Sequence, residues 1–401
     1  MFNLGVIGAA GEEGMTSQTW ATWDGTKDGS SVSIGANSEG FTAVVALSST
    51  EVLAFYADNT NGYGAACVGT VSGNSISWGT STIVTGTSII GNNEDQPSVS
   101  MTVMSSTQVL VAYVDNNLAG QAFVINISGT TPSGGALTAF PGVIPGIYTP
   151  QNYTPCVSAL SSTAAIICFT NVFSPIGLFV YVITISSSVV TFNGNVQIIN
   201  GSTAIGCAVS MISSAAALLV YGDSTNSNFL TGQVISISGT TPSGNPPYVI
   251  DNTNAVQVGL KSSGIYLTQL NSTSFIAYYN GNTAGNDYGV VVSISGTTTS
   301  GGSPAIVDNA GSGGVRNYIT RGNSTSPMFL YGNSGSGLIG LTGNVSGTAI
   351  TFNSPVTIDG SVSDPYMFAC SLDSDRIAVT YVPNNSGSPG GPVKGVVLSI
   401  V

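Results

Sequence analysis

The sequence predicts an all-β fold, a seven-bladed β-propeller with four antiparallel strands in each blade. A Ser/Thr-rich turn followed by an apolar strand recurs seven times at intervals of about 50 to 60 residues, and self-similarity at such a period is typical of repeat architectures. Apolar and β-branched runs alternate with clusters of Gly, Asn, Ser and Pro, and no segment has the apolar periodicity of a helix. Seven repeats of four strands match a closed propeller.

Each repeat carries an aromatic residue six positions after the end of its turn. At one shared position in successive blades, we expect these rings to pack between adjacent sheets, with the tyrosine hydroxyls reaching a wet rim. An exposed platform that stacks on sugars is the alternative. The seven residues are Tyr56, Tyr113, Phe169, Tyr221, Tyr279, Tyr331 and Tyr381.

The second repeat shows the four expected strands. They lie at 97–104, 108–114, 121–128 and around 136–140. Near-identical SGTT-type segments begin at 128, 238 and 295, and we expect them to be turns between third and fourth strands because Gly, Pro, Ser and Thr favour turns.

The two ends of the chain are expected to close the ring. The seventh repeat shows three strand-like segments before Val401, so an N-terminal strand at 19–25 would complete the seventh blade and remove exposed edges. Residues 1–18 would then be an extension or tether, and residues 19–401 a single propeller. Trp20, Trp23 and Trp78 are the best candidates for exposed stacking, although Trp20 and Trp23 are expected to pack in the closing strand.

The composition excludes several function classes. The net charge is −12, with only six Lys and Arg, whereas nucleic-acid binding needs clustered cations. The same deficit argues against attachment to anionic lipid, and no apolar run is long enough to span a bilayer. We therefore expect no nucleic-acid partner and no membrane insertion.

The acidic residues are expected to gather on one face of the ring. Loops after second strands and after fourth strands share a face, and most of the 18 acids fall there. This face is the candidate site for cations or polyhydroxylated ligands. The ligand-binding candidates are Glu94, Asp95, Asp251, Asp287, Asp308, Asp359 and Asp364.

Calcium is the one cofactor that the sequence suggests. Asp58, Asp115 and Asp223 follow the recurring aromatic by two residues, and Ca²⁺ prefers carboxylate oxygens. They are candidate metal ligands, and capping of their own turns is the alternative. The five cysteines are dispersed without a CxxC pair or any histidine, so we expect buried free thiols, with one inter-blade disulfide as the alternative.

Catalysis is not predicted. Without histidine, Ser/His and Cys/His nucleophile systems are excluded in their usual forms. Glu94 and Asp95 are the obvious adjacent acidic pair for a glycosidase, but adjacent acids in a polar loop are normally only solvated. N-x-S/T sequons mark candidate glycosylation sites at Asn126, Asn152, Asn200, Asn271, Asn323, Asn344 and Asn384.

The SGTT-type segments, together with few charges and abundant Gly, Ser, Thr and Asn, resemble β-propeller modules of virion appendages such as tail fibres or spikes and of microbial surface proteins. This resemblance implies a non-enzymatic structural or attachment protein at an extracellular or virion surface, such as a filament building block in contact with other subunits. The alternative is a lectin-like propeller that binds cell-surface glycans, with or without Ca²⁺. A glycosidase or lyase is a distant third.

Overall fold

The computed structural model describes residues 32–58, 62–89, 99–115, 119–141, 155–171, 176–202, 204–257, 264–281, 286–308, 317–333, 337–384 and 392–399. All regular secondary structure in these ranges is β, in 32 strands. The described residues contain no helix that could span a membrane.

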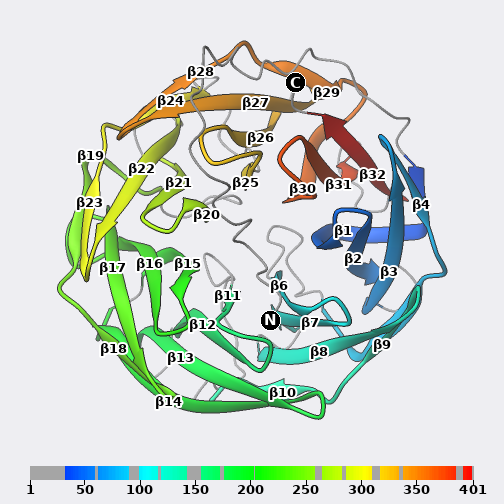
Figure 1. Ribbon diagram of the computed structural model, residues 1–401, viewed down its shortest axis with the longest axis horizontal. Coiled ribbons are helices and arrows are strands. Elements are labelled where there is room, and N and C mark those ends of the chain that lie inside the picture. The colour runs from blue at the N-terminus through cyan, green and yellow to red at the C-terminus, as the bar shows by residue number, and fades with distance from the viewer. Residues whose placement is uncertain are drawn as a thin grey trace, which may run out of the picture.

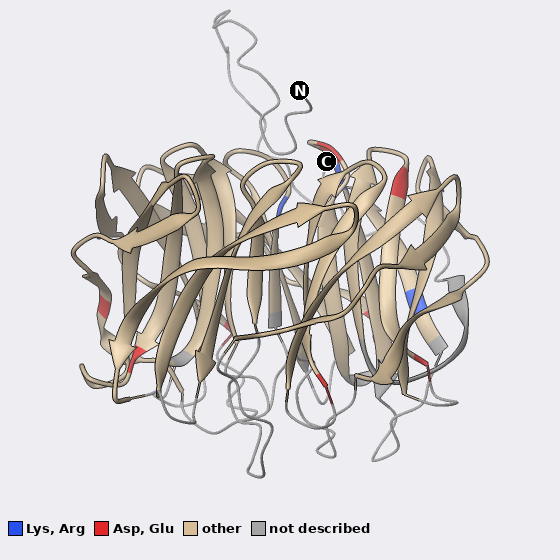
Figure 2. Cartoon of the chain, turned by 90° about the horizontal axis from the view of Figure 1, so that it is seen from below, with Lys and Arg blue, Asp and Glu red and all other residues tan. Residues whose placement is uncertain are grey.

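The strands form seven antiparallel blades around a central axis, which confirms the predicted seven-bladed propeller (Figure 1). Figure 2 shows that the strands run between the two ends of the ring. Blade 1 contains the second part of β1 (Val32–Ser48), β2 (Glu51–Asp58), β3 (Tyr63–Ser72), β4 (Ser75–Trp78) and β5 (Thr82–Ser88). Blade 2 contains β6 (Val99–Ser105), β7 (Gln108–Val114), β8 (Gly120–Ser128), β9 (Thr131–Gly134) and β10 (Thr138–Ala139).

The next three blades repeat this order. Blade 3 contains β11 (Cys156–Ala159), β12 (Ala164–Asn171), β13 (Gly177–Ser186) and β14 (Val189–Asn200). Blade 4 contains β15 (Ile205–Ser213), β16 (Ala216–Asp223), β17 (Phe229–Ser238), β18 (Thr241–Gly244) and β19 (Tyr248–Ala255). Blade 5 contains β20 (Ile265–Asn271), β21 (Ser274–Asn280), β22 (Asp287–Ser295), β23 (Thr298–Gly301) and β24 (Ala305–Asp308).

The last two blades return to the start of the chain. Blade 6 contains β25 (Asn317–Arg321), β26 (Pro327–Asn333), β27 (Gly337–Ser346), β28 (Ala349–Phe352) and β29 (Val356–Asp359). Blade 7 contains β30 (Ser363–Ser371), β31 (Arg376–Asn384), β32 (Pro392–Ser399) and the first part of β1.

Each SGTT-type segment contains the predicted turn between third and fourth strands, but the fourth strand begins within the segment, earlier than we predicted. Gly129 takes a positive φ of 58° at the tip, and Thr131–Gly134 then pairs with β8 as a strand. Pro132 lies opposite Ile127 and is buried. The fourth strand of this blade is therefore split into two segments, β9 and β10, and the same split occurs at β18/β19 and β23/β24.

Blade 7 is closed by the N-terminal part of the described chain, as predicted. Val32 pairs with Gly395 and Asn37 with Pro392, and the same strand continues as the innermost strand of blade 1, pairing with β2. The segment expected in this role, 19–25, lies outside the described residues, as does the expected extension 1–18. The described part of the closing strand therefore lies later in the sequence than the segment that we predicted.

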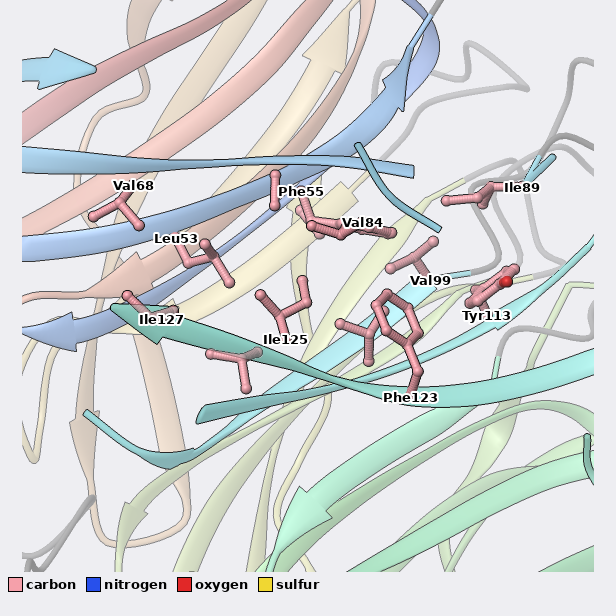
Figure 3. Packing of buried hydrophobic residues seen from close by; sticks show 14 of the residues in the cluster. Leu53, Phe55, Val68, Val84, Ile89, Val99, Tyr113, Phe123, Ile125 and Ile127 are labelled. Atoms are coloured by element: carbon pink, nitrogen blue, oxygen red, sulfur yellow. The ribbon is translucent and has the colours of Figure 1, made fainter. Parts of the chain in front are cut away.

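The apolar core lies between neighbouring blades. Between blades 1 and 2, Leu53 and Phe55 from β2 face Phe123 and Ile125 from β8 (Figure 3). The Phe55 and Phe123 rings lie 6.0 Å apart between centroids. Because each blade buries its faces only against its neighbours, stability depends on the complete ring.

Candidate functional site

Asp and Glu residues are more numerous at one end of the ring than at the other among the described residues (Figure 2). We call the end where second strands finish and third strands begin the acidic rim. The opposite end carries Glu51, Asp373 and Asp375, at the turns between first and second strands. The acids that described strands place at the acidic rim are Glu39, Asp58, Asp115, Asp223, Asp251, Asp287, Asp308, Asp359 and Asp364.

The seven recurring aromatics are core residues, as predicted, and each has an exposed fraction of 4% or less. They cannot form an exposed stacking platform. Three hydroxyls reach the fourth strand of the preceding blade. Tyr113 contacts Thr87 at 2.8 Å, Tyr279 donates to Asp251, and Tyr381 donates to Asp359 at 2.7 Å. These Tyr-centred hydrogen bonds link adjacent blades.

Asp359 belongs to an internal polar cluster. Its carboxylate accepts hydrogen bonds from Tyr381 and from the Ser361 backbone N–H, and Lys394 Nζ lies 3.3 Å away. Burial alone would raise the pKa of Asp359, but the hydrogen bonds from Ser361 and Tyr381 and the charge of Lys394 outweigh it and hold this pKa well below its usual range. Asp359 is therefore an ionised structural group that joins blades 6 and 7.

Asp251 and Asp287 are also buried and bonded within the protein. Asp251 accepts hydrogen bonds from Tyr279 and from the backbone N–H groups of Thr253 and Asn254. Asp287 accepts hydrogen bonds from Asn280 and, at 3.1 Å, from the hydroxyl of Tyr278. A ligand-binding role for these two acids stays a prediction.

The three candidate calcium ligands lie on three different blades. Asp115 is 4% exposed and accepts hydrogen bonds from the Ala119 N–H and from Gln121 Nε2. Asp223 is partly exposed and accepts hydrogen bonds from the N–H and hydroxyl of Thr225. Among the described residues, no three carboxylates lie close enough together to share an ion. The structure thus shows local capping at Asp115 and Asp223, and calcium binding stays a prediction.

On the acidic rim, carboxylates pair with aromatic rings, a feature that was not predicted from the sequence. Asp223, at the end of β16, is the cross-strand partner of Phe229, at the start of β17, and both are partly exposed. In blade 1, the pairing of Ala57 with Gly64 places Asp58 and Tyr63 in the same relation. Cross-strand partners share one sheet face, so each carboxylate lies beside a ring. The register of each hairpin is the signal that could have revealed it.

The remaining candidates divide between described and undescribed positions. Trp78 is packed against Gly395 in the joint between blades 1 and 7 and is not an exposed stacking residue. Asn271 and Asn323 close turns by accepting from Thr273 and Thr325. Asn126, Asn200 and Asn344 lie in strands, and Asp364 and Asn384 lie in β30 and β31. Glu94, Asp95, Asn152, Trp20 and Trp23 lie outside the described residues.

The innermost strands surround an axial cavity of about 250 Å³. Tyr266, Tyr318 and Phe368 from blades 5, 6 and 7 line one side. The Tyr318 and Phe368 rings pack against each other with their centroids 4.8 Å apart and their planes tilted by 47°. Cys156 and Cys207 from blades 3 and 4 line another part of the wall. The cavity therefore combines an aromatic wall with a wall that carries thiols.

The structure brings together three cysteines that sequence analysis treated as dispersed. Cys156 on β11 is the cross-strand partner of Cys168 on β12, and Cys207 lies on the facing strand β15 of the next blade. All are free thiols, as predicted, and the Sγ atoms of Cys168 and Cys207 are 3.4 Å apart. Cys156 and Cys207 occupy first strands of successive repeats, which is the signal that could have indicated their proximity.

Comparison with solved structures identifies other β-propellers. A lectin from Burkholderia pseudomallei has a TM-score of 0.59 at 13% identity, covering 91% of this chain and 100% of the lectin. A candidate 6-phosphogluconolactonase from Bacteroides fragilis has a TM-score of 0.53 at 10% identity, covering 80% and 85%. The Aleuria aurantia lectin has a TM-score of 0.47 at 11% identity, covering 81% and 98%. No protein-family model and no curated protein matches the sequence. At these identities the first two comparisons support the propeller fold alone.

Proposed function

We propose that the protein is a non-catalytic, lectin-like propeller that binds carbohydrate at the acidic rim. The partly exposed pair of Asp223 and Phe229 carries this proposal. A sugar presents hydroxyl donors and an apolar C–H face. The carboxylate provides a strong acceptor for the hydroxyls, and the ring provides a flat apolar surface for the C–H face.

The remaining acids support binding over hydrolysis. Glycosidases need two carboxylates that are free to act on one glycosidic bond. Asp251, Asp287 and Asp359 are instead engaged in internal hydrogen bonds, and the sequence contains no histidine. The Burkholderia pseudomallei protein, which is a lectin, shares the fold over 91% of this chain and supports the same proposal.

A second candidate function is assembly with further protein subunits at an extracellular or virion surface. Ile83 and Ile306 are 44% and 49% exposed on the outer strands β5 and β24. They occupy matching positions, opposite Ala65 and Tyr288 of their third strands. Apolar side chains on outer edge strands favour contacts with other chains.

A glycan array tests the carbohydrate proposal. Wild type, Asp223→Asn and Phe229→Ala are compared, with Asp375→Asn at the opposite end of the ring as the matched control. We expect selective binding by wild type and the control, and at least tenfold weaker binding by the two rim variants. Equal binding by all four proteins, or no binding by wild type, would contradict the proposal. Repeating the array with Ca²⁺ and with chelator determines whether calcium takes part.

A further inference from the structure

We propose that Cys156, Cys168 and Cys207 form a binding site for a divalent thiophilic cation, such as Zn²⁺, in the wall of the axial cavity. This site is independent of the carbohydrate proposal because it lies on the innermost strands of blades 3 and 4 and their neighbours, away from the rim pair. Thiolates are soft ligands that select Zn²⁺ and similar cations over Ca²⁺ or Mg²⁺.

The spacing of the thiols fits a shared cation. The three Sγ atoms all lie within 4.8 Å of one another, and those of Cys168 and Cys207 are 3.4 Å apart. Around a tetrahedral Zn²⁺ with Zn–S bonds of about 2.3 Å, sulfur atoms lie about 3.8 Å apart. A disulfide needs about 2.0 Å between the sulfurs, so the observed spacing is closer to that of a metal site than to that of a bridge.

The strands hold the three thiols in place before any cation binds. Cys156 and Cys168 are fixed opposite each other by the pairing of β11 with β12. The Met211 N–H donates to Ser158 Oγ at 2.9 Å and ties β15 to β11, which positions Cys207. Cys168 and Cys207 are at most 4% exposed and lie in an apolar cluster. Pre-organised ligands lose little conformational entropy on binding.

The charge balance favours a divalent cation. Binding breaks three S–H bonds, forms three metal–sulfur bonds and releases three protons, with no change of oxidation state. A divalent cation leaves one net negative charge in apolar surroundings, whereas a monovalent cation leaves two, and buried charge is costly.

The cavity leaves room for a further ligand beside the cluster. Cys156 and Cys207 both line the cavity, so a cation held by the thiols would border its open volume. Sites with three protein ligands commonly keep the fourth position for water. The Cys156 thiol donates to the Cys207 carbonyl oxygen at 2.9 Å, which shows that this carbonyl also faces the cluster.

Cobalt titration of the reduced, chelator-treated full chain tests the site. We expect a thiolate-to-Co²⁺ charge-transfer absorbance that saturates at one equivalent and disappears on addition of Zn²⁺. Cys156→Ser and Cys207→Ser should lose this absorbance. Cys67→Ser, which changes a buried thiol in blade 1 that bonds to the Gly79 carbonyl, is the matched control and should titrate like wild type. Absence of the band in wild type, or an unchanged titration in Cys156→Ser, would overturn the proposal.

A second measurement needs only the wild-type protein, in case the serine variants fail to fold. Alkylation of native protein, followed by peptide mapping, is compared with and without Zn²⁺. We expect Zn²⁺ to slow modification of Cys156 at least tenfold and to leave Cys370, which lies on blade 7, unchanged. Equal alkylation of Cys156 with and without Zn²⁺ would overturn the proposal. The affinity for Zn²⁺ should rise with pH because protons are released.

Discussion

Blade 5 and blade 7 have the same strand order but are held in different ways. Blade 5 is built from one continuous stretch of chain, whereas blade 7 takes its fourth strand from the N-terminal part of β1. Both ion pairs found among the described residues, Arg376–Asp373 and Lys394–Asp359, involve blade 7. Arg376 also donates to the carbonyl oxygens of Gly73 and Ser49 in blade 1.

Blades 5 and 7 differ in how the chain connects their strands. In blade 5, neighbouring strands are joined by short turns, so little loop entropy opposes their pairing. The closing joint instead brings together residues that are far apart in sequence. The hydroxyls of Thr42 and Thr380, which are 338 positions apart, form a hydrogen bond of 3.1 Å. Among the described residues, ion pairs and long-range polar contacts are therefore concentrated at blade 7, where short connections along the chain do least to hold the strands together.

Deletion of residues 1–38 should have the largest effect. It removes the part of β1 that pairs with β32 and leaves the β32 edge of blade 7 exposed. We expect the free energy of unfolding to fall by roughly 5 kcal/mol or more, which is larger than the effect of most single substitutions. Urea unfolding measures it. Deletion of 1–18, the expected extension, should leave stability unchanged, and equal stability of the full chain and the 1–38 deletion would refute closure by β1.

Asp359→Asn should destabilise more than Asp251→Asn. Asp359→Asn removes the negative charge that is paired with Lys394. Asp251→Asn leaves an amide that can still hydrogen-bond with Tyr279, and among the described residues it deprives no cation of its ion-pair partner. We expect losses of about 2 and about 1 kcal/mol, since hydrogen bonds to charged groups contribute more. Chemical denaturation of both variants makes the comparison. A larger effect at Asp251 would remove the special role of charge at blade 7.

Acid should weaken the blade 7 joint selectively. The pKa of Asp359 is lower in the folded than in the unfolded protein, so its stabilising effect is complete above the unfolded value of about 3.9 and is lost as pH falls through the folded value. Burial would raise the pKa of Asp373 as well, but hydrogen bonds from Arg376 outweigh this and lower it. Stability of wild type should therefore fall more steeply below about pH 4 than that of Asp359→Asn. Parallel pH profiles would count against the inference.

Tyr381→Phe and Tyr279→Phe remove one hydroxyl each from the two inter-blade links. Both rings stay buried, so the change isolates the hydrogen bond to Asp359 or Asp251. We expect each to cost about 1 kcal/mol, with the larger loss at Tyr381, where the acceptor is held ionised. Differential scanning calorimetry of the two variants is the measurement. No loss in either variant would show that the hydroxyls only fill space.

Asp223→Asn should have the smallest effect on stability. Asp223 is partly exposed, and an asparagine there can still cap Thr225. We expect a change within about 0.5 kcal/mol, as for most surface substitutions, together with the loss of glycan binding proposed above. A thermal melt beside the glycan array separates the two effects. Marked destabilisation would place Asp223 with the structural acids Asp251 and Asp359.

The sequence by itself determined the features that are local or repeated. Strand identity follows from apolar runs and turn residues, and blade number follows from seven recurrences of one turn. Burial of Tyr279 and Tyr381 follows from the same repetition, because a residue at one blade position lies between the same two strands' faces in each blade and is buried in each. These features can be predicted from short sequence patterns and from the number of repeats.

Only the tertiary structure decided how residues of the same type come to have different roles. Asp359 and Asp223 both follow the pattern of acids near strand ends, yet one is paired with Lys394 and the other faces solvent beside Phe229. Cys207 meets Cys168 because two blades face each other, and the described closing strand is the first part of β1 because of its register with β32. Register and blade-to-blade packing are set by the sum of many long-range contacts, and no short segment of sequence contains that information.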